Sequence, residues 1–314
     1  MPELPEVESV RRGLAAAKVR APVRELWRSE HKLRIGKHWR DENLEVLVGA
    51  RPGPLRRRGK HIIWEFFSSA SSKSSSKSTS SKKSPSKRSS SKNSRAESPE
   101  LGLLIHLGMS GRCGIARAGD PQARHTHMVL RFGDGRELRF VDPRRFGGLR
   151  AGSLAALLAA PPLSTLGIEP LDPEFCGAEL QTRLGASKRA IRDALLDQHA
   201  VAGIGNIYAV EALFIARIHP LTRPTRIRPS AWERLAKALV QVLEQGIANG
   251  GTTLKDFRNV VGEVGRNQDD LSVYGRAGQP CPSCGRPLEG FTHGGRSGVL
   301  CPFDQARPRG GWVR

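Results

Sequence analysis

The first eight residues, Met-Pro-Glu-Leu-Pro-Glu-Val-Glu, include groups that could form a covalent bond to a sugar. If Met1 is removed, which the small Pro2 should permit, the chain begins with a secondary amine beside the carboxylate of Glu3. An α-amino group titrates near pH 7.7–8.0, so about a tenth of it is neutral at pH 7, against less than about a thousandth of an ordinary lysine. Such an amine is a ready nucleophile toward an aldehyde carbon, and the iminium product is an electron sink. The alternative is purely structural, since Pro5 and Glu6 are also typical of the first turn of a helix.

A second group of reactive side chains lies near the C-terminus. Cys281 and Cys284 are followed, after sixteen residues, by Cys301 and Asp304, a spacing typical of a zinc ribbon. Asp304 stands where a fourth cysteine would complete the set, and a carboxylate should bind zinc more weakly than a thiolate. His293 is a further ligand type, but it falls toward the tip of the expected hairpin, away from the metal. These four residues therefore predict one zinc ion per monomer, with a metal-free hairpin as the alternative.

Two glycines and an asparagine mark a third feature of the sequence. Gly203, Gly205 and Asn206 form a tight connection directly before an expected helix, which would expose backbone N–H groups to an anion. A buried helical hairpin would explain the glycines and the apolar periodicity equally well. It would not explain the whole Gly-Ile-Gly-Asn-Ile-Tyr-Ala string that begins at Gly203.

Charge and composition define the class of partner. The 314 residues carry a formal net charge of +21, with a pI near 10.8, which favours a nucleic acid. A serine-rich tract at 68–99 contributes only about +7 of this charge, so the rest of the chain is itself basic. We find no signal peptide or 18-residue apolar span, so we expect no membrane contact. The cysteines form no disulfide framework, which fits a reducing cytoplasm. We therefore expect a cytoplasmic, nucleoid-associated protein, and we expect it to be a monomer.

The elements that must position these groups fall into an α+β multidomain pattern. A helix is expected over 5–18, and later helices over 153–160, 176–185, 188–197, 206–215 and 230–248. Between the first helix and residue 150 the chain contains short strand-like runs separated by turn signals, which is typical of a β-sandwich. These runs include 46–48, 61–67, 103–106, 128–132 and 137–141.

The serine-rich tract at 68–99 lies between two of these strands, 61–67 and 103–106. It has too few hydrophobic residues to bury a core, so we expect a disordered insertion. A solubilising role without further function is favoured over electrostatic contact with DNA through its lysines.

Five motifs, in order along the chain, resemble those of formamidopyrimidine-DNA glycosylases of the bacterial Fpg/MutM type. They are the N-terminal Met-Pro-Glu-Leu-Pro-Glu, the basic run ending in Lys60, the loops at 106–111 and 142–147, the string at 203–209, and the cysteine module with its Val-Tyr-Gly-Arg lead-in. The resemblance implies a catalytic β-sandwich domain over 1–149, a helix–two-turn–helix DNA-binding domain over 150–272, a zinc-finger-like β-hairpin over 273–306 and a tail over 307–314.

The same resemblance implies the chemistry. The expected enzyme is a bifunctional DNA glycosylase and AP lyase that removes oxidised purines, such as 8-oxoguanine and formamidopyrimidines, from duplex DNA and also cuts at abasic sites. Pro2 would form a Schiff base with C1′ of the deoxyribose, Glu3 would act as acid and base, and Glu6 would support it. Lys60 would contact the phosphate and assist β-elimination, and Arg296 would grip the lesion phosphate and assist δ-elimination.

Further residues match the DNA contacts of this family. Met109 would fill the stack vacated by a flipped base, Phe146 would wedge between bases, and Arg144 would reach the orphaned cytosine. The flanking phosphates and other DNA positions would be held by His106, Asn206, His125 and Lys188. Taken alone, His125 and His127 could also suggest a metal site.

The chain departs from the family in the loop over 262–271, where Arg266 and Asn267 follow Gly265 instead of an aromatic residue. This departure affects the contact that would cover the flipped base. Two alternative functions follow from the sequence. One is the sister class that acts on oxidised pyrimidines, and the other is a non-catalytic protein that binds damaged DNA.

Overall fold

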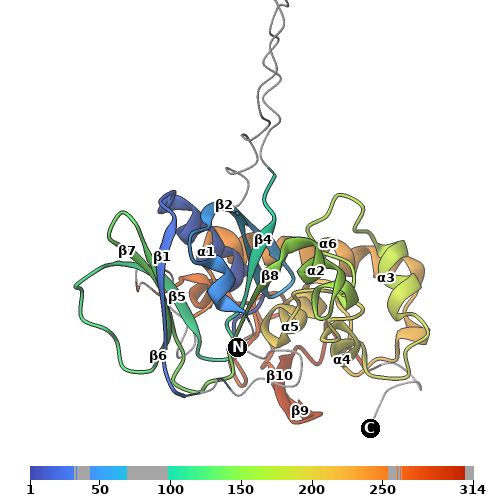
Figure 1. The fold of residues 1–314 in the computed structure, drawn as a ribbon. Helices are drawn as coiled ribbons and strands as arrows, with labels where there is room; N and C mark the ends of the chain where they lie inside the picture. Colours follow the sequence, from blue (N-terminus) through green and yellow to red (C-terminus); the bar gives the residue numbers. More distant parts are fainter. Residues whose placement is uncertain are drawn as a thin grey trace, which may run out of the picture.

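The computed structural model describes residues 1–31, 33, 43–68, 98–253, 260, 262 and 264–307. Most of the predicted insertion, residues 69–97, and the C-terminal residues 308–314 lie outside this described part. The remaining chain forms a β-sandwich, a helical domain and a C-terminal hairpin, as the sequence predicts (Figure 1).

Two antiparallel four-stranded sheets form the sandwich. One has the order β1-β6-β7-β5 and the other the order β2-β3-β4-β8. In β3, Ile62 and Trp64 face the core between the sheets, whereas Ile63 faces a separate apolar cluster beside the helical domain. The strand is therefore buried on both faces, which explains its almost continuous apolar sequence. The strands are β1 (Val23–Arg28), β2 (Arg51–Arg58), β3 (His61–Phe67), β4 (Leu101–His106), β5 (Arg112–Arg117), β6 (Thr126–Phe132), β7 (Arg136–Val141) and β8 (Gly148–Ser153).

Helix α1 (Leu4–Ala16) connects the sandwich to the helical domain. Val7, Val10 and Leu14 recur on one face and enter the sandwich core, while Leu4 belongs to the core of the helical domain. The helix ends two residues before the predicted limit, since Lys18 adopts the left-handed conformation with φ of 48°. In Figure 1 the N-terminus lies at the junction of the two halves.

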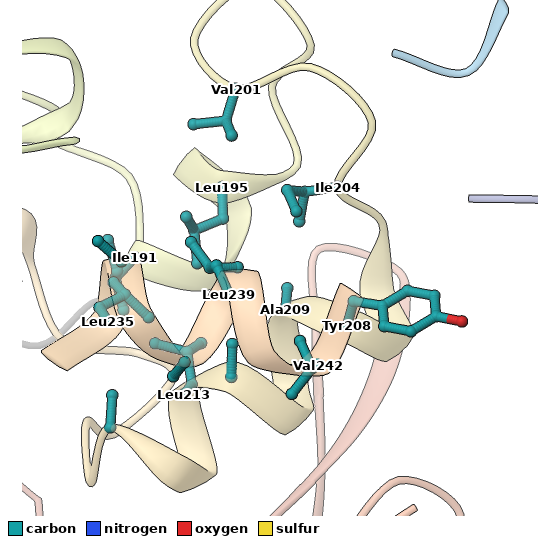
Figure 2. Packing of buried hydrophobic residues seen from close by; sticks show 14 of the residues in the cluster. Ile191, Leu195, Val201, Ile204, Tyr208, Ala209, Leu213, Leu235, Leu239 and Val242 are labelled. Atoms are coloured by element: carbon teal, nitrogen blue, oxygen red, sulfur yellow. The ribbon is translucent and has the colours of Figure 1, made fainter. Parts of the chain in front are cut away.

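The helical domain packs α5 against α6 (Figure 2). Ile191, Leu213, Leu235 and Leu239 are among the fully buried side chains of its core. The predicted helix over 188–197 is too long, because Ala190 has an extended backbone and the helix begins only at the next residue. The helices are α2 (Leu154–Ala159), α3 (Gly177–Leu184), α4 (Ile191–Leu195), α5 (Asn206–Ile215) and α6 (Pro229–Ala248). None of the described helices has the length and apolar character needed to cross a membrane.

The predicted strand at 46–48 is wrong. Residues Leu44–Leu47 form a short 3-10 helix, in which Leu44 and Leu47 are buried three positions apart while Val46 and Val48 are exposed. The preceding Asn43 has a φ of 69°, which breaks the extended path. Strand β2 was not among the named runs, and it contains Pro52, Gly53 and Pro54, which are unusual in a strand. The structure accommodates them at a shift in register within β2.

The C-terminal hairpin consists of β9 (Glu289–His293) and β10 (Arg296–Leu300). It is fixed to the helical domain by a small apolar core, to which α5 contributes Val210 and Phe214 and the hairpin contributes Leu288 and Val299. The finger is therefore an extension of the helical domain, and its tip lies below α5 in Figure 1.

Candidate active site

The N-terminus of the chain meets the N-terminus of α5. Glu3 accepts hydrogen bonds from the backbone N–H groups of Ile207 (3.1 Å) and Tyr208 (3.4 Å), so its carboxylate lies at the positive end of this helix. A Cβ atom at Gly205 would lie only 2.1 Å from the Glu3 carboxyl carbon. The second glycine of the Gly-Ile-Gly-Asn motif therefore makes room for the acidic side chain.

Glu6 is buried directly behind Glu3. One carboxylate oxygen accepts the Glu3 N–H at 2.7 Å, and the other accepts the Tyr208 hydroxyl at 2.8 Å and the Thr252 N–H at 2.6 Å. All of these partners are buried. Because three donors converge on it, Glu6 fixes the backbone of the residue that carries the candidate acid.

Lys60 occupies the turn between β2 and β3 and is 5% exposed. Glu169, in the connection after the sandwich, holds this turn in place. It accepts the Gly59 N–H and forms ion pairs with Arg57 (2.8 Å) and Arg58 (3.2 Å). Two arginines of the basic run that ends in Lys60 thus form a partly buried contact with Glu169, which holds the turn that carries Lys60.

A cavity of about 250 Å³ brings the predicted catalytic groups together. Its lining includes Met1, Glu3, Lys60 and Arg296, which come from three separate segments of the chain. Pro2 is buried beside these groups. The other lining residues are Leu196, Gln198, Ile204, Gly205, Asn206, Ile207 and Tyr274.

Burial changes the acid–base properties of this cavity. It raises the pKa of Glu3 to about 7, with the Lys60 charge opposing the shift and the Glu6 charge adding to it. Burial also lowers the pKa of Lys60, against the attraction of Glu3 and Glu6, and Arg296 lowers it further. Glu3 can therefore carry or release a proton near neutral pH, as a general acid must.

The tips of two loops lie beside one another because both donate hydrogen bonds to one buried carboxylate. Asp142 accepts hydrogen bonds from the Ser110 hydroxyl (2.5 Å) and the Gly147 N–H (2.6 Å), and so ties the 106–111 loop to the 142–147 loop. Gly108 packs directly against the backbone of Phe146, where a Cβ would lie 2.3 Å from the carbonyl carbon. The loops are thus built as one unit.

This unit presents its apolar side chains to solvent. Met109 is 39% exposed and Phe146 is 38% exposed, and the guanidinium of Arg144 lies 5.1 Å from the centre of the Phe146 ring. Exposed apolar side chains on a rigid turn suit insertion between bases. The three residues predicted to enter the base stack or contact the orphaned base are therefore brought together at one surface.

The remaining predicted DNA contacts are spread around this surface and the cavity. His106 lies at the end of β4, where burial, strengthened by the Lys60 charge, lowers its pKa to about 4. Its Nδ1 atom accepts the Gly108 N–H at 3.2 Å, so the neutral ring carries its proton on Nε2. The Asn206 amide donates to the Ser297 carbonyl at 2.8 Å and joins α5 to the finger. His125 and Lys188 are exposed, and neither lines the cavity.

The metal alternative at His125 and His127 is not supported by the geometry. Both ring nitrogens of His127 have protein partners, the Ser29 hydroxyl at 2.9 Å and the Asp142 carbonyl at 3.0 Å. Within the described residues, the group suited to a metal ion is instead the C-terminal one.

In this group, Cys281, Cys284, Cys301 and Asp304 place one ligand atom each within 4.8 Å of one another. The sulfur atoms of Cys284 and Cys301 are 3.5 Å apart, and an Asp304 oxygen lies 3.7 Å from the Cys281 sulfur. The Asp304 N–H also points at the Cys301 sulfur, at 3.3 Å. Three sulfur atoms and one oxygen atom converge, as a tetrahedrally coordinated metal ion requires, so the residues present fit a metal site. His293 lies outside it and pairs with Asp193 at 3.2 Å.

One residue that holds the finger was missed by the sequence interpretation. Arg192 in α4 is fully buried and donates to the carbonyl oxygens of His293 (2.6 Å) and Arg296 (3.1 Å). It also bonds Asp193 and lies 5.5 Å from the Phe291 ring centre. The only available signal was an arginine on the apolar face of a predicted helix. Arg192 fixes the hairpin turn that carries Arg296.

Arg192→Gln is expected to loosen the finger tip. Glutamine cannot reach both carbonyl groups, and breaking such a buried charged contact costs about 3 kcal/mol. Amide hydrogen exchange over 289–300 should therefore accelerate by on the order of 100-fold. Arg189→Gln is the matched control, because Arg189 is 53% exposed and pairs only at the surface. Unchanged protection in Arg192→Gln would contradict this role.

The loop expected to cover the base contributes nothing described to the cavity lining. Gly265 packs against the backbone of Gly251, where a Cβ would lie 2.0 Å from the carbonyl oxygen. Asn267, which stands in the region where the family resemblance leads us to expect an aromatic residue, is 3% exposed and points into the protein. Where the chain departs from the family pattern, it therefore has a buried polar side chain, that of Asn267.

Comparisons with known proteins agree with this architecture. The family model of the formamidopyrimidine-DNA glycosylase N-terminal domain matches residues 1–149, that of the H2TH domain matches 166–258, and that of the zinc finger found in FPG and IleRS matches 278–307. The formamidopyrimidine-DNA glycosylase of Moorella thermoacetica is 38% identical over 92% of this chain and 94% of its own length. The Stenotrophomonas maltophilia enzyme is 37% identical over 97% of this chain and its whole length.

Solved structures give the same result. The MutM (Fpg) protein of Thermus thermophilus superposes with a TM-score of 0.76 at 33% identity, over 98% of this chain and all of that one. The Lactococcus lactis Fpg in complex with DNA containing an abasic site superposes with a TM-score of 0.79 at 27% identity, over 97% of this chain and all of that one.

These matches, together with the fold and the cavity at the N-terminus, define the class of protein. It is a DNA glycosylase that is also an AP lyase, and it acts on oxidised purines and abasic sites in DNA. The chain belongs to the formamidopyrimidine-DNA glycosylase family.

Proposed function

We propose that the protein excises oxidised purines from duplex DNA through a Schiff base on Pro2 and then cuts the strand by β- and δ-elimination. The observation that supports this most directly is the convergence of Met1, Glu3, Lys60 and Arg296 on one cavity of about 250 Å³. Removal of Met1 would free the Pro2 amine inside this cavity. The amine forms a bond to C1′ as the bond to the base breaks, and opening of the sugar ring at the C1′–O bond then gives the iminium. In each elimination the iminium accepts the electron pair of a sugar C–H bond, and that pair then expels the phosphate.

Glu3 supplies and recovers protons in this scheme. With a pKa of about 7 it is partly protonated at neutral pH, so it can protonate the sugar ring oxygen as the ring opens. Glu6 supports it through the Glu3 N–H. Lys60 and Arg296, both in the cavity lining, are placed to bind the phosphates that leave in the β and δ steps.

DNA would bend over the exposed loop pair. Met109 and Phe146 would enter the base stack, and Arg144 would contact the base left without a partner. His106 and Asn206 would hold the phosphates next to the flipped nucleotide, while the exposed His125 and Lys188 would contact the duplex further out. The L. lactis relatives crystallised with abasic-site and Fapy-dG DNA, and the MutM complex with carbocyclic 8-oxo-G DNA, support double-stranded damaged DNA as the partner.

We assign the catalytic sandwich to 1–149, the DNA-binding helical domain to 150–272 and the finger to 273–306. Within the finger, zinc bound by the three cysteines and Asp304 would cross-link the two ends of the hairpin module. Its contribution is structural, since the group lies at the base of the hairpin and Arg296 at its tip.

Asp304→Cys is expected to strengthen zinc binding. A thiolate is the softer and stronger ligand, so release of zinc to a competing chelator should slow by about tenfold or more. Native mass spectrometry and a colorimetric chelator assay measure occupancy and release, and Ser283→Ala is the control between the cysteines. Wild-type protein that stays metal-free in excess zinc would contradict the zinc assignment.

The function itself is tested with a duplex that carries 8-oxoguanine opposite cytosine. We expect release of the free base and a one-nucleotide gap with a phosphate at each end. Cleavage of an oxidised-pyrimidine duplex in preference to this one would favour the sister class. Binding without base release or strand cleavage would favour the non-catalytic alternative.

A further inference from the structure

A buried polar network extends from the candidate acid to the segment 264–271. Tyr208 belongs to α5, and Figure 2 shows its ring leaving the apolar cluster with the hydroxyl directed away from it. This hydroxyl lies 2.8 Å from a Glu6 oxygen and 3.1 Å from the Thr252 hydroxyl. The Asn267 amide nitrogen lies 2.8 Å from the same Thr252 hydroxyl. Glu6 in α1, Tyr208 in α5 and the pair Thr252 and Asn267 are distant in sequence, but their side chains thus meet in one buried network.

The direction of every hydrogen bond in this network is determined by the carboxylates at its two ends. Asp270 is an acceptor, so the Asn249 amide nitrogen donates to it (2.7 Å) and also to the Asn267 side-chain oxygen (3.2 Å). This places the Asn267 amide nitrogen toward Thr252. The Thr252 hydroxyl accepts from Asn267 and donates to the Tyr208 oxygen, whose own proton goes to the Glu6 carboxylate.

The chain of donors therefore ends on Glu6, whose pKa is raised by burial and lowered by the hydrogen bonds that it accepts from Thr252, Glu3 and Tyr208. Hydrogen bonds aligned in one direction polarise one another, and they stabilise the charged acceptor at the end of the row. On its other oxygen, Glu6 holds the N–H of Glu3. The charged groups that act on this pair are Lys60, which attracts both carboxylates, and Arg296, which acts on Lys60.

We propose that Asn267 is a positioning residue for base excision, which acts through Thr252, Tyr208 and Glu6 on the acid Glu3. It favours the charged form of Glu6 and fixes this side chain behind Glu3 without touching the DNA. The inference rests on the proposed function, in which the protonated form of Glu3 is required. The charge on Glu6 is one of the causes that raise the pKa of Glu3 to about 7, so a weaker donor chain makes Glu3 a stronger acid.

The test is the pH profile of single-turnover excision of 8-oxoguanine. Asn267→Leu keeps the size of the side chain but removes the donor, and Thr252→Val removes the next link. Each is expected to move the alkaline limb of the profile down by about half a pH unit, which lowers the rate at pH 8 about threefold and leaves it unchanged at pH 6. The double variant should show the same shift as either single one, because both break one chain.

Asp269→Asn is the matched control, an exposed neighbour in the same segment. A rate reduced equally at all pH values, or an alkaline limb that coincides with that of the wild type in folded variants, would overturn the proposal. Glu3→Gln separates this failure from failure of the proposed function. If Glu3→Gln keeps the wild-type alkaline limb, Glu3 is not the acid and the proposed function fails; if it abolishes the limb while the other variants do not move it, only the role of Asn267 fails.

Discussion

Pro2→Gly is expected to lower both base excision and strand cleavage by on the order of 1,000-fold, while affinity for the damaged duplex changes by less than about threefold. Proline supplies a secondary amine held against the start of α1, whereas glycine supplies a primary amine on a freely rotating backbone. In the proposed function, the interactions with DNA come from the loops and the finger, which this change leaves intact. Single-turnover kinetics and binding to an uncleavable abasic analogue measure the two effects separately.

The comparison requires that both proteins have lost Met1, which intact-mass measurement verifies. Pro173→Gly serves as the control, since Pro173 is exposed in the connection before α3. Wild-type rates in fully processed Pro2→Gly would rule out the proposed nucleophile. A parallel loss of DNA affinity would instead indicate that Pro2 shapes the binding surface.

Glu3→Gln is expected to slow base excision strongly yet stabilise the folded protein above neutral pH. Loss of the acid should lower the excision rate by about 10²–10⁴-fold. The stability effect follows from burial, which raises the pKa of Glu3 from 4.5 to about 7. Since the native protein binds this proton more tightly than the unfolded chain, the stability of the wild type falls as pH rises from about 4.5 to 7.

Glutamine removes this penalty, so the gain in unfolding free energy should be small near pH 4.5 and reach on the order of 3 kcal/mol at about pH 8.5. Denaturant unfolding at several pH values measures it, with the exposed Glu174→Gln as control. A variant less stable than wild type at the alkaline end would mean that the carboxylate at the start of α5 contributes more through its charge than burial costs.

Much of the fold could be predicted from periodicity and turn signals. The sandwich, the helices and the hairpin are all present, because each depends on an apolar pattern of its own. The errors occur where a local signal was outweighed by packing. Val46 and Val48 favour a strand by residue type, but burial of Leu44 and Leu47 three positions apart selects a 3-10 turn. The prolines of β2 conceal a strand that the sheet accommodates through a shift in register.

The candidate site divides in a similar way. Residues within motifs, such as Glu3 and Lys60, could be named from the sequence, and the structure brings them into one cavity. Residues that act through a distant partner could not be found, since nothing in the sequence joins Arg192 to Arg296 or Asn267 to Glu6. Both contacts span separate domains or segments, and only the fold defines them.

The most direct test of the central claim is borohydride trapping on a duplex with 8-oxoguanine opposite cytosine, followed by mass spectrometry of the cross-linked peptide. We predict a covalent adduct on the amine of Pro2, formed by the protein that has lost Met1. An adduct on a lysine side chain, or no adduct with either this duplex or an abasic site when the protein is folded and binds both, would contradict the account.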